Sequence, residues 1–227
     1  MDIKYNLEEI HPKVFLVTMD NSYDLAMTFC RVQEFYESPF KEIRGKYFNI
    51  LEFQRMYSMK FGDGCFTYPH DWAGFNVPSE ILINCYTNIN RPIIDFNCYD
   101  EIIWDFHNQI TLKGVEKYYL IGAETKAQST INHEVAHAFY CLYPKYKKAA
   151  NEITNQISDK SKNKIKKWLL SIGYNDKVFK DELQAYLTAD LEKVIDITEP
   201  SKKESKQLQK TSIKLQKLND EYKNRKS

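Results

Sequence analysis

The most strongly specified element of this sequence is a helix predicted between Thr125 and Pro144. Thr125 and Gln128 have the spacing of a capping box, in which the hydroxyl accepts a backbone N–H and the glutamine reaches back to the helix start. Proline disfavours the helical conformation in the residue that precedes it, so we expect the helix to end near Leu142. The segment between these signals is amphipathic, which predicts a helix packed against a core.

Two histidines lie away from the apolar stripe of this helix and therefore face a cleft or solvent. The stripe comprises Ile131, Val135, Ala138 and Leu142. His133 and His137 are four residues apart, which places them about 40° apart on one face of a helix. Two imidazoles in this arrangement can bind one Zn²⁺ at about 2.0–2.1 Å. Glu134 points about 100° further round the helix, where it can reach a water on the metal without binding the metal itself.

These residues form the pentapeptide HExxH within the uncharged segment TINHEVAHAF, residues 130–139. The segment resembles the longer signature of the zinc metallopeptidases called zincins. The resemblance implies peptide-bond hydrolysis, with His133 and His137 as zinc ligands and Glu134 as the general base. No histidine follows His137, which excludes the metzincin pattern HExxHxxGxxH. The alternative is that two surface histidines happen to be neighbours on a helix.

A catalytic zinc needs a third protein ligand and one open position. The downstream acids before the final segment are Glu152, Asp159, Asp176, Asp181, Glu182, Asp190, Glu192, Asp196 and Glu199. A helix is predicted over 176–193, with one apolar face that is expected to be buried. Glu182 lies on the flank of this buried stripe, whereas Asp181 points away from it. The sequence from Asp181 to Tyr186 also resembles the glutamate helix of the gluzincin branch. We therefore predict that one Zn²⁺ per chain binds His133, His137 and Glu182; the alternative is that Glu182 is an ordinary, partly exposed helix residue.

Several further roles remain open in the sequence. Candidates for stabilising the oxyanion are Tyr140, Tyr143, Tyr186 and His107. Asp181 or Asp190 can orient a histidine. A Cys/His nucleophile pair formed by Cys65 with His70 or His107 has only residue type in its favour. The acidic cluster of Asp100, Glu101 and Asp105 is expected to form a solvated face.

The predicted fold class is α+β: a mainly helical, zincin-like domain with a small sheet beside the HExxH helix. Strands are expected at 14–18 and at 117–121, the second closed by Gly122. Helices are expected at 22–37, 49–60, 162–172 and 176–193, the last capped by Asn175. Residues 61–78 should be mostly loop, and residues 79–113 mix β-prone runs with acids. The order strand–helix–helix over 117–191 also resembles zincins, in which a sheet edge beside the active-site helix can hold an extended substrate.

We predict a single domain over 1–199, in which residues 1–115 fit no family and residues 117–193 form the metal-site core. Residues 201–227 contain nine Lys or Arg and three acids. This basic segment is interpreted as a helical arm or, with more weight on this reading, a solvated tail. It is a candidate for weak contact with nucleic acid or an acidic partner.

The whole chain carries 32 basic and 31 acidic residues, so no global field draws it to nucleic acid or membrane. It shows no secretory signal and no apolar run long enough to span a bilayer. Five cysteines without a CxxC pair predict reduced thiols and a cytoplasmic protein, although non-standard export or injection would leave no mark. The leading functional hypothesis is a zinc metallopeptidase acting on a protein or peptide; the alternative is a zincin-like binding or regulatory module.

Overall fold

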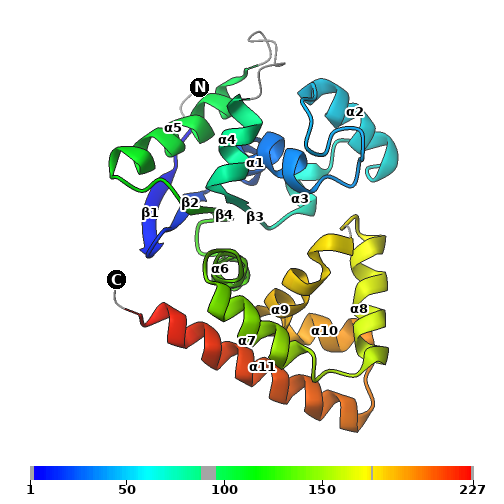
Figure 1. Ribbon diagram of the computed structural model, residues 1–227. Coiled ribbons are helices and arrows are strands. Elements are labelled where there is room, and N and C mark those ends of the chain that lie inside the picture. Colours follow the sequence, from blue (N-terminus) through cyan, green and yellow to red (C-terminus); the bar gives the residue numbers. More distant parts are fainter. Residues whose placement is uncertain (1–2, 88–95, 175, 226–227) are drawn as a thin grey trace. The chain divides into compact units, whose positions relative to one another are not determined.

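The computed structural model describes residues 3–87, 96–174 and 176–225, and it confirms the α+β class (Figure 1). The contacts between residues divide the chain into two compact units, 1–127 and 128–227. This boundary falls directly before the HExxH helix, inside the range that we predicted as one domain. The final basic segment belongs to the second unit.

The first unit contains a mixed four-stranded sheet with the strand order β1-β2-β4-β3. Its strands are β1 (Asn6–His11), β2 (Val14–Met19), β3 (Gly74–Pro78) and β4 (Tyr119–Glu124). β2 and β4 are parallel and central, which explains their continuous apolar sequences, while β1 and β3 pair antiparallel at the sides. Because β4 pairs on both sides, the strand that precedes the HExxH helix in the sequence is not an edge strand of this sheet.

Gly122 lies within β4 instead of closing it, contrary to the sequence prediction. A Cβ atom at this position would come within 2.4 Å of the Phe29 ring. Phe29 belongs to α1 (Ser22–Glu37), the central helix packed on the sheet. The glycine therefore allows the helix to approach the strand closely, and the strand continues through it.

The other helices of the first unit surround this core. They are α2 (Ile50–Lys60), α3 (Tyr68–Asp71), α4 (Ser79–Thr87) and α5 (Cys98–Leu112). The prediction for 22–37 is confirmed, and that for 49–60 is confirmed to within one residue. The β-prone reading of 79–113 is wrong for the described residues, because α4 and α5 are amphipathic helices whose apolar residues enter the core.

The second unit is helical throughout its described secondary structure. It comprises α6 (Gln128–Leu142), α7 (Pro144–Thr154), α8 (Asp159–Ser171), the 3₁₀ turn η2 (Asp176–Val178), α9 (Phe179–Ala189), α10 (Leu191–Thr198) and α11 (Lys202–Lys223). The helix predicted over 176–193 is broken at Asp190, whose ψ of 48° ends α9 and starts α10. Asn175, its predicted cap, lies outside the described residues.

The basic segment forms α11 and is not a solvated tail within its described part. Ser201 and Glu204 form a capping box at its start. Its inner face buries Leu208, Leu215 and Tyr222, and the helix packs along α7 and α9. Apolar residues at helical spacing thus proved sufficient to attach this segment to the second unit, despite their small number.

All five cysteines are free, and two of them, Cys30 and Cys85, are buried. Among the described helices, none combines the length and apolar character needed to cross a membrane.

Candidate metal centre

The HExxH motif lies in α6, which begins at Gln128, three residues after the predicted cap Thr125. Lys126 has a φ of 74°, so a right-handed helix cannot pass through it, and the backbone N–H of Thr125 donates to Met19 instead. The end of α6 at Leu142 agrees with the prediction. The predicted start of the helix is therefore wrong, whereas the prediction that His133 and His137 share one face of it is correct.

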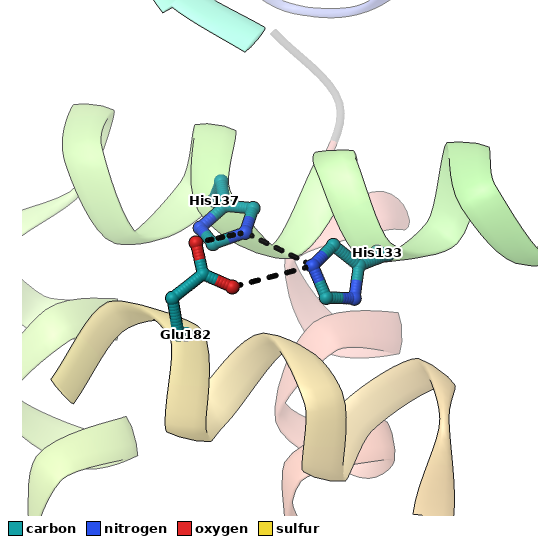
Figure 2. A group of neighbouring side chains, drawn as sticks. All are labelled: His133, His137 and Glu182. Atoms are coloured by element: carbon teal, nitrogen blue, oxygen red, sulfur yellow. Dashed lines mark hydrogen bonds and ion pairs between the residues drawn. The ribbon is translucent and has the colours of Figure 1, made fainter. Parts of the chain in front are cut away.

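Two histidines of α6 and one glutamate of α9 converge at a single buried point (Figure 2). The Nε2 atoms of His133 and His137 are 3.2 Å apart. The Glu182 carboxylate lies 3.7 Å from His133 Nε2 through Oε2 and 3.6 Å from His137 Nε2 through Oε1. Ligands bound tetrahedrally to one zinc at about 2.0–2.1 Å are separated by roughly 3.3 Å. The three residues predicted from the sequence are thus brought together at spacings that fit one shared cation.

The hydrogen bonds around this point also indicate a cation. The Nδ1 atom of each histidine faces an aspartate, at 2.9 Å for His133 and Asp190 and at 2.8 Å for His137 and Asp181. When each Nδ1–H donates to its aspartate, the Nε2 atoms present lone pairs to one another and to the Glu182 carboxylate. Glu182 Oε2 is buried and has no hydrogen-bond partner within the described part of the chain. This buried His-His-Glu group can therefore hold a metal ion.

The two aspartates occupy the positions of outer partners that orient metal-binding histidines. The sequence raised this role for both residues without favouring either one. It was wrong to direct Asp181 away from α6, because that carboxylate bonds His137 Nδ1. The break at Asp190 between α9 and α10 turns its carboxylate towards His133, where Ser129 also donates to it at 3.1 Å.

The carboxylates also raise the pKa values of both histidines. Burial alone would lower the pKa of His133, but Asp190 and Glu182 outweigh it and raise that pKa to about 9. Burial acts in the same direction on His137, and the charges of Asp181 and Glu182 raise its pKa well above the usual value. The site therefore favours a positive charge, which a proton or a metal ion can supply.

Glu134, the predicted base, is 6% exposed, and its charge contributes to the raised pKa values of both histidines. Of the candidate oxyanion donors, Tyr186 packs against the site: its ring centroid is 4.6 Å from that of His133. Burial raises the pKa of Tyr186, so its phenol stays protonated at neutral pH.

The other three candidates have different partners. Tyr140 donates to Asn151 at 3.0 Å, Tyr143 packs on Phe139 and Tyr222, and His107 lies in the first unit.

The remaining sequence candidates form no comparable group. Cys65 and His70 are exposed, while His107 Nδ1 lies 2.8 Å from the Tyr118 hydroxyl. Glu101 and Asp105 are exposed, as expected of a solvated face. Asp100 is not: it is buried and paired with Arg31 at 2.7 Å. Sequence reasoning missed this pair because its partners are far apart in the chain.

Comparison of the chain with family models, with curated proteins and with solved structures finds no match. The residues of the site itself are therefore the guide to function.

Proposed function

We propose that this protein is a zinc-dependent metallopeptidase that hydrolyses peptide bonds in a protein or peptide substrate. The observation that carries the proposal is the convergence of two imidazole nitrogens and one carboxylate at a buried point. Two nitrogens and one oxygen are a donor set of catalytic zinc sites, in which a fourth position stays open. The intact HExxH motif adds a carboxylate that is not part of this donor set.

His133, His137 and Glu182 would hold the zinc ion. A zinc ion bound there would lower the pKa of its water towards about 7 and polarise a substrate carbonyl. Asp181 and Asp190 accept the Nδ1 protons of the two histidines, which keeps both Nε2 atoms directed at the metal position. The ligand geometry is thus held by the chain before any metal binds.

Glu134 has the role of general base in this proposal. It follows His133 in α6 and is buried, and its charge influences both histidines. The carboxylate accepts the proton of the attacking water and passes it to the leaving amine. The Tyr186 phenol beside His133 is a donor that can stabilise the developing oxyanion.

The variant Glu134→Gln tests the proposal because it removes the base and keeps the size of the side chain. We expect full zinc content and a loss of peptide hydrolysis of about 10²–10⁴-fold or more. The measurement is zinc analysis together with mass spectrometry of peptides released from a protein mixture. His133→Ala is the matched control and should lose both zinc and activity. A Glu134→Gln protein as active as the parent would contradict the proposal.

A zincin-like binding or regulatory module is the alternative function. It shares the zinc site but not the chemistry, so it predicts that the parent binds zinc and releases no peptides. The intact Glu134 favours the enzyme, because a module that only binds has no need of a base at this position.

A second contact, with a polyanion, is proposed for the outer face of α11. Residues 128–227 contain 20 basic and 13 acidic residues, whereas residues 1–127 contain 12 and 18. Lys206, Lys210 and Lys217 share a shallow outer groove with Ile213, along about 16 Å of helix. Weak binding of a single-stranded oligonucleotide should fall steeply with added salt and be lost in Lys210→Glu/Lys217→Glu. Binding that does not respond to salt would remove this proposal.

A further inference from the structure

The two histidines of the metal centre are supported by networks of different kinds. The two aspartates are similarly exposed, at 31% for the Asp190 side chain and 27% for that of Asp181, so the difference lies in their next partners. On the His133 side, Asp190 receives one further hydrogen bond, from the exposed Ser129. On the His137 side, the supporting chain continues into the core of the second unit. This difference lies outside the residues that would touch the metal or the substrate.

The His137 chain consists of three hydrogen bonds in series. His137 Nδ1 lies 2.8 Å from Asp181 Oδ1. The same oxygen accepts a hydrogen bond from Gln184 Nε2 at 3.1 Å. Gln184 Oε1 in turn accepts a hydrogen bond from the Tyr146 hydroxyl at 3.1 Å. Gln184 and Tyr146 are both 0% exposed, so water cannot replace either partner.

The direction of this chain is set by the Asp181 carboxylate, which can only accept hydrogen bonds. Gln184 therefore points its amide nitrogen at Asp181 and its carbonyl oxygen at Tyr146. That carbonyl oxygen also only accepts, so the Tyr146 phenol donates its one proton to it. On the other side of Asp181, the donor is His137 Nδ1–H. The Nε2 lone pair of His137 is consequently left directed at Glu182 and His133.

The Tyr146 ring is itself held between two helices. Its centroid lies 5.7 Å from that of Phe139 in α6 and 5.2 Å from that of Tyr222 in α11. Edge-to-face contacts of this kind restrict the ring in direction as well as in position. The basic C-terminal helix therefore contacts the residue on which the buried chain ends.

We propose that Tyr146 and Gln184 are positioning residues of the metal centre, which hold His137 through Asp181 in its metal-binding orientation, and that α11 supports them through Tyr222. This inference rests on the proposed zinc site and does not depend on which bond the enzyme cleaves. It also assigns a role to the C-terminal helix, whose removal would expose and loosen the buried end of the chain.

Tyr146→Phe and Gln184→Met test the inference, because each removes hydrogen bonds with little change in volume. Ser129→Ala is the matched control, since it removes the corresponding hydroxyl on the His133 side. The zinc dissociation constant is measured by competition with a chromogenic chelator. The visible spectrum of the Co²⁺-loaded protein reports ligand geometry, which a loss of stability alone would not change. All variants are measured in the full chain, well below their unfolding temperatures.

We expect Tyr146→Phe and Gln184→Met to weaken zinc binding roughly tenfold, as outer partners of metal ligands do, and to shift the cobalt bands. Ser129→Ala should leave both readouts close to the parent. Parent-like zinc affinity and an unchanged cobalt spectrum in Tyr146→Phe would overturn the inference, even if that variant unfolds more easily. An equally large effect of Ser129→Ala on zinc affinity and the cobalt bands would overturn the proposed difference between the His133 and His137 networks. A parent protein that binds neither metal would instead defeat the proposed function, so the two failures are distinguishable.

Discussion

Each unit of this protein contains a buried cluster of ionisable side chains, and the two clusters differ in how completely their polar atoms are paired. In the first unit, Arg31 donates to both carboxylate oxygens of Asp100, at 2.7 and 3.0 Å, and to the Phe48 carbonyl at 2.8 Å. Tyr86 donates to the same carboxylate at 2.8 Å. The charges are neutralised within the protein, as buried ion pairs require.

The cluster in the second unit is similarly buried, but it is open in the sense that its polar atoms are not all paired within the described part of the chain. When both Nδ1 protons are donated to the aspartates, His133, His137 and Glu182 direct only acceptor atoms at one another, so a proton or a metal ion is needed between them. Burial of charge is therefore not in itself a sign of function. A closed set of donors and acceptors stabilises a fold, whereas an excess of acceptors around one point indicates a site for a cation.

The largest expected effect on folding comes from opening the closed cluster. Arg31→Met leaves the Asp100 carboxylate buried without its cation and should lower the free energy of unfolding by about 3–5 kcal/mol. Urea denaturation of the full chain measures this. Zinc stoichiometry should stay at the parent value, since Arg31 belongs to the other unit. A loss of zinc together with stability would contradict the separation of the two clusters.

Binding of zinc at the open cluster should instead raise the free energy of unfolding. Free zinc at about 1,000 times its dissociation constant should stabilise the native state by about 4 kcal/mol. Thermal unfolding with and without a chelator gives the difference. His133→Ala supplies the control, because it should show no stabilisation by zinc. An equal shift in that variant would mean that zinc binds elsewhere.

Glu182 and its neighbour Asp181 in α9 should differ in their effect on zinc binding. Asp181→Ala removes an outer partner and should weaken zinc binding by roughly 10- to 100-fold. Glu182→Ala removes an atom of the donor set itself, so its loss of affinity should be larger. Isothermal titration with zinc ranks the two variants. The reverse order would show that Glu182 has been wrongly identified as the ligand.

The smallest effect concerns pH in the metal-free protein. The pKa of His133 is raised from 6.5 to about 9 in the folded state. A folded-state pKa above the unfolded value contributes stability that is fully present below about pH 6.5 and is lost as the pH rises through about 9. Urea midpoints should therefore fall across this range for metal-free protein. Zinc-loaded protein should not show this loss, because the metal replaces the proton; identical pH profiles would contradict the interpretation.

Local signals predicted the features of the site that can be read within each helix separately. The spacing of His133 and His137 places them on one face, and the end of α6 before Pro144 was read correctly. Glu182 was selected from nine acids by its position relative to a buried stripe, and the structure brings it to the histidines. The start of α6 was misread because Thr125 matches a cap by residue type alone.

Long-range packing accounts for what the sequence left open or did not predict. The bonds of Asp181 and Asp190 to the histidines depend on how α9 lies against α6 and on the break at Asp190. The helix at the C-terminus was favoured as a tail because its few apolar residues give a weak signal. Once α7 and α9 are present, Leu208, Leu215 and Tyr222 can be buried, and the helix becomes part of the unit.

The order of residues along the chain was enough to define the paired imidazoles, since helix geometry relates neighbours four residues apart whatever surrounds them. The approach of Glu182 to these imidazoles, the bonds of the two aspartates and the buried chain from Tyr146 to His137 were decided only in three dimensions. They come from helices whose packing depends on burial of apolar faces across the second unit, and no local rule encodes those contacts.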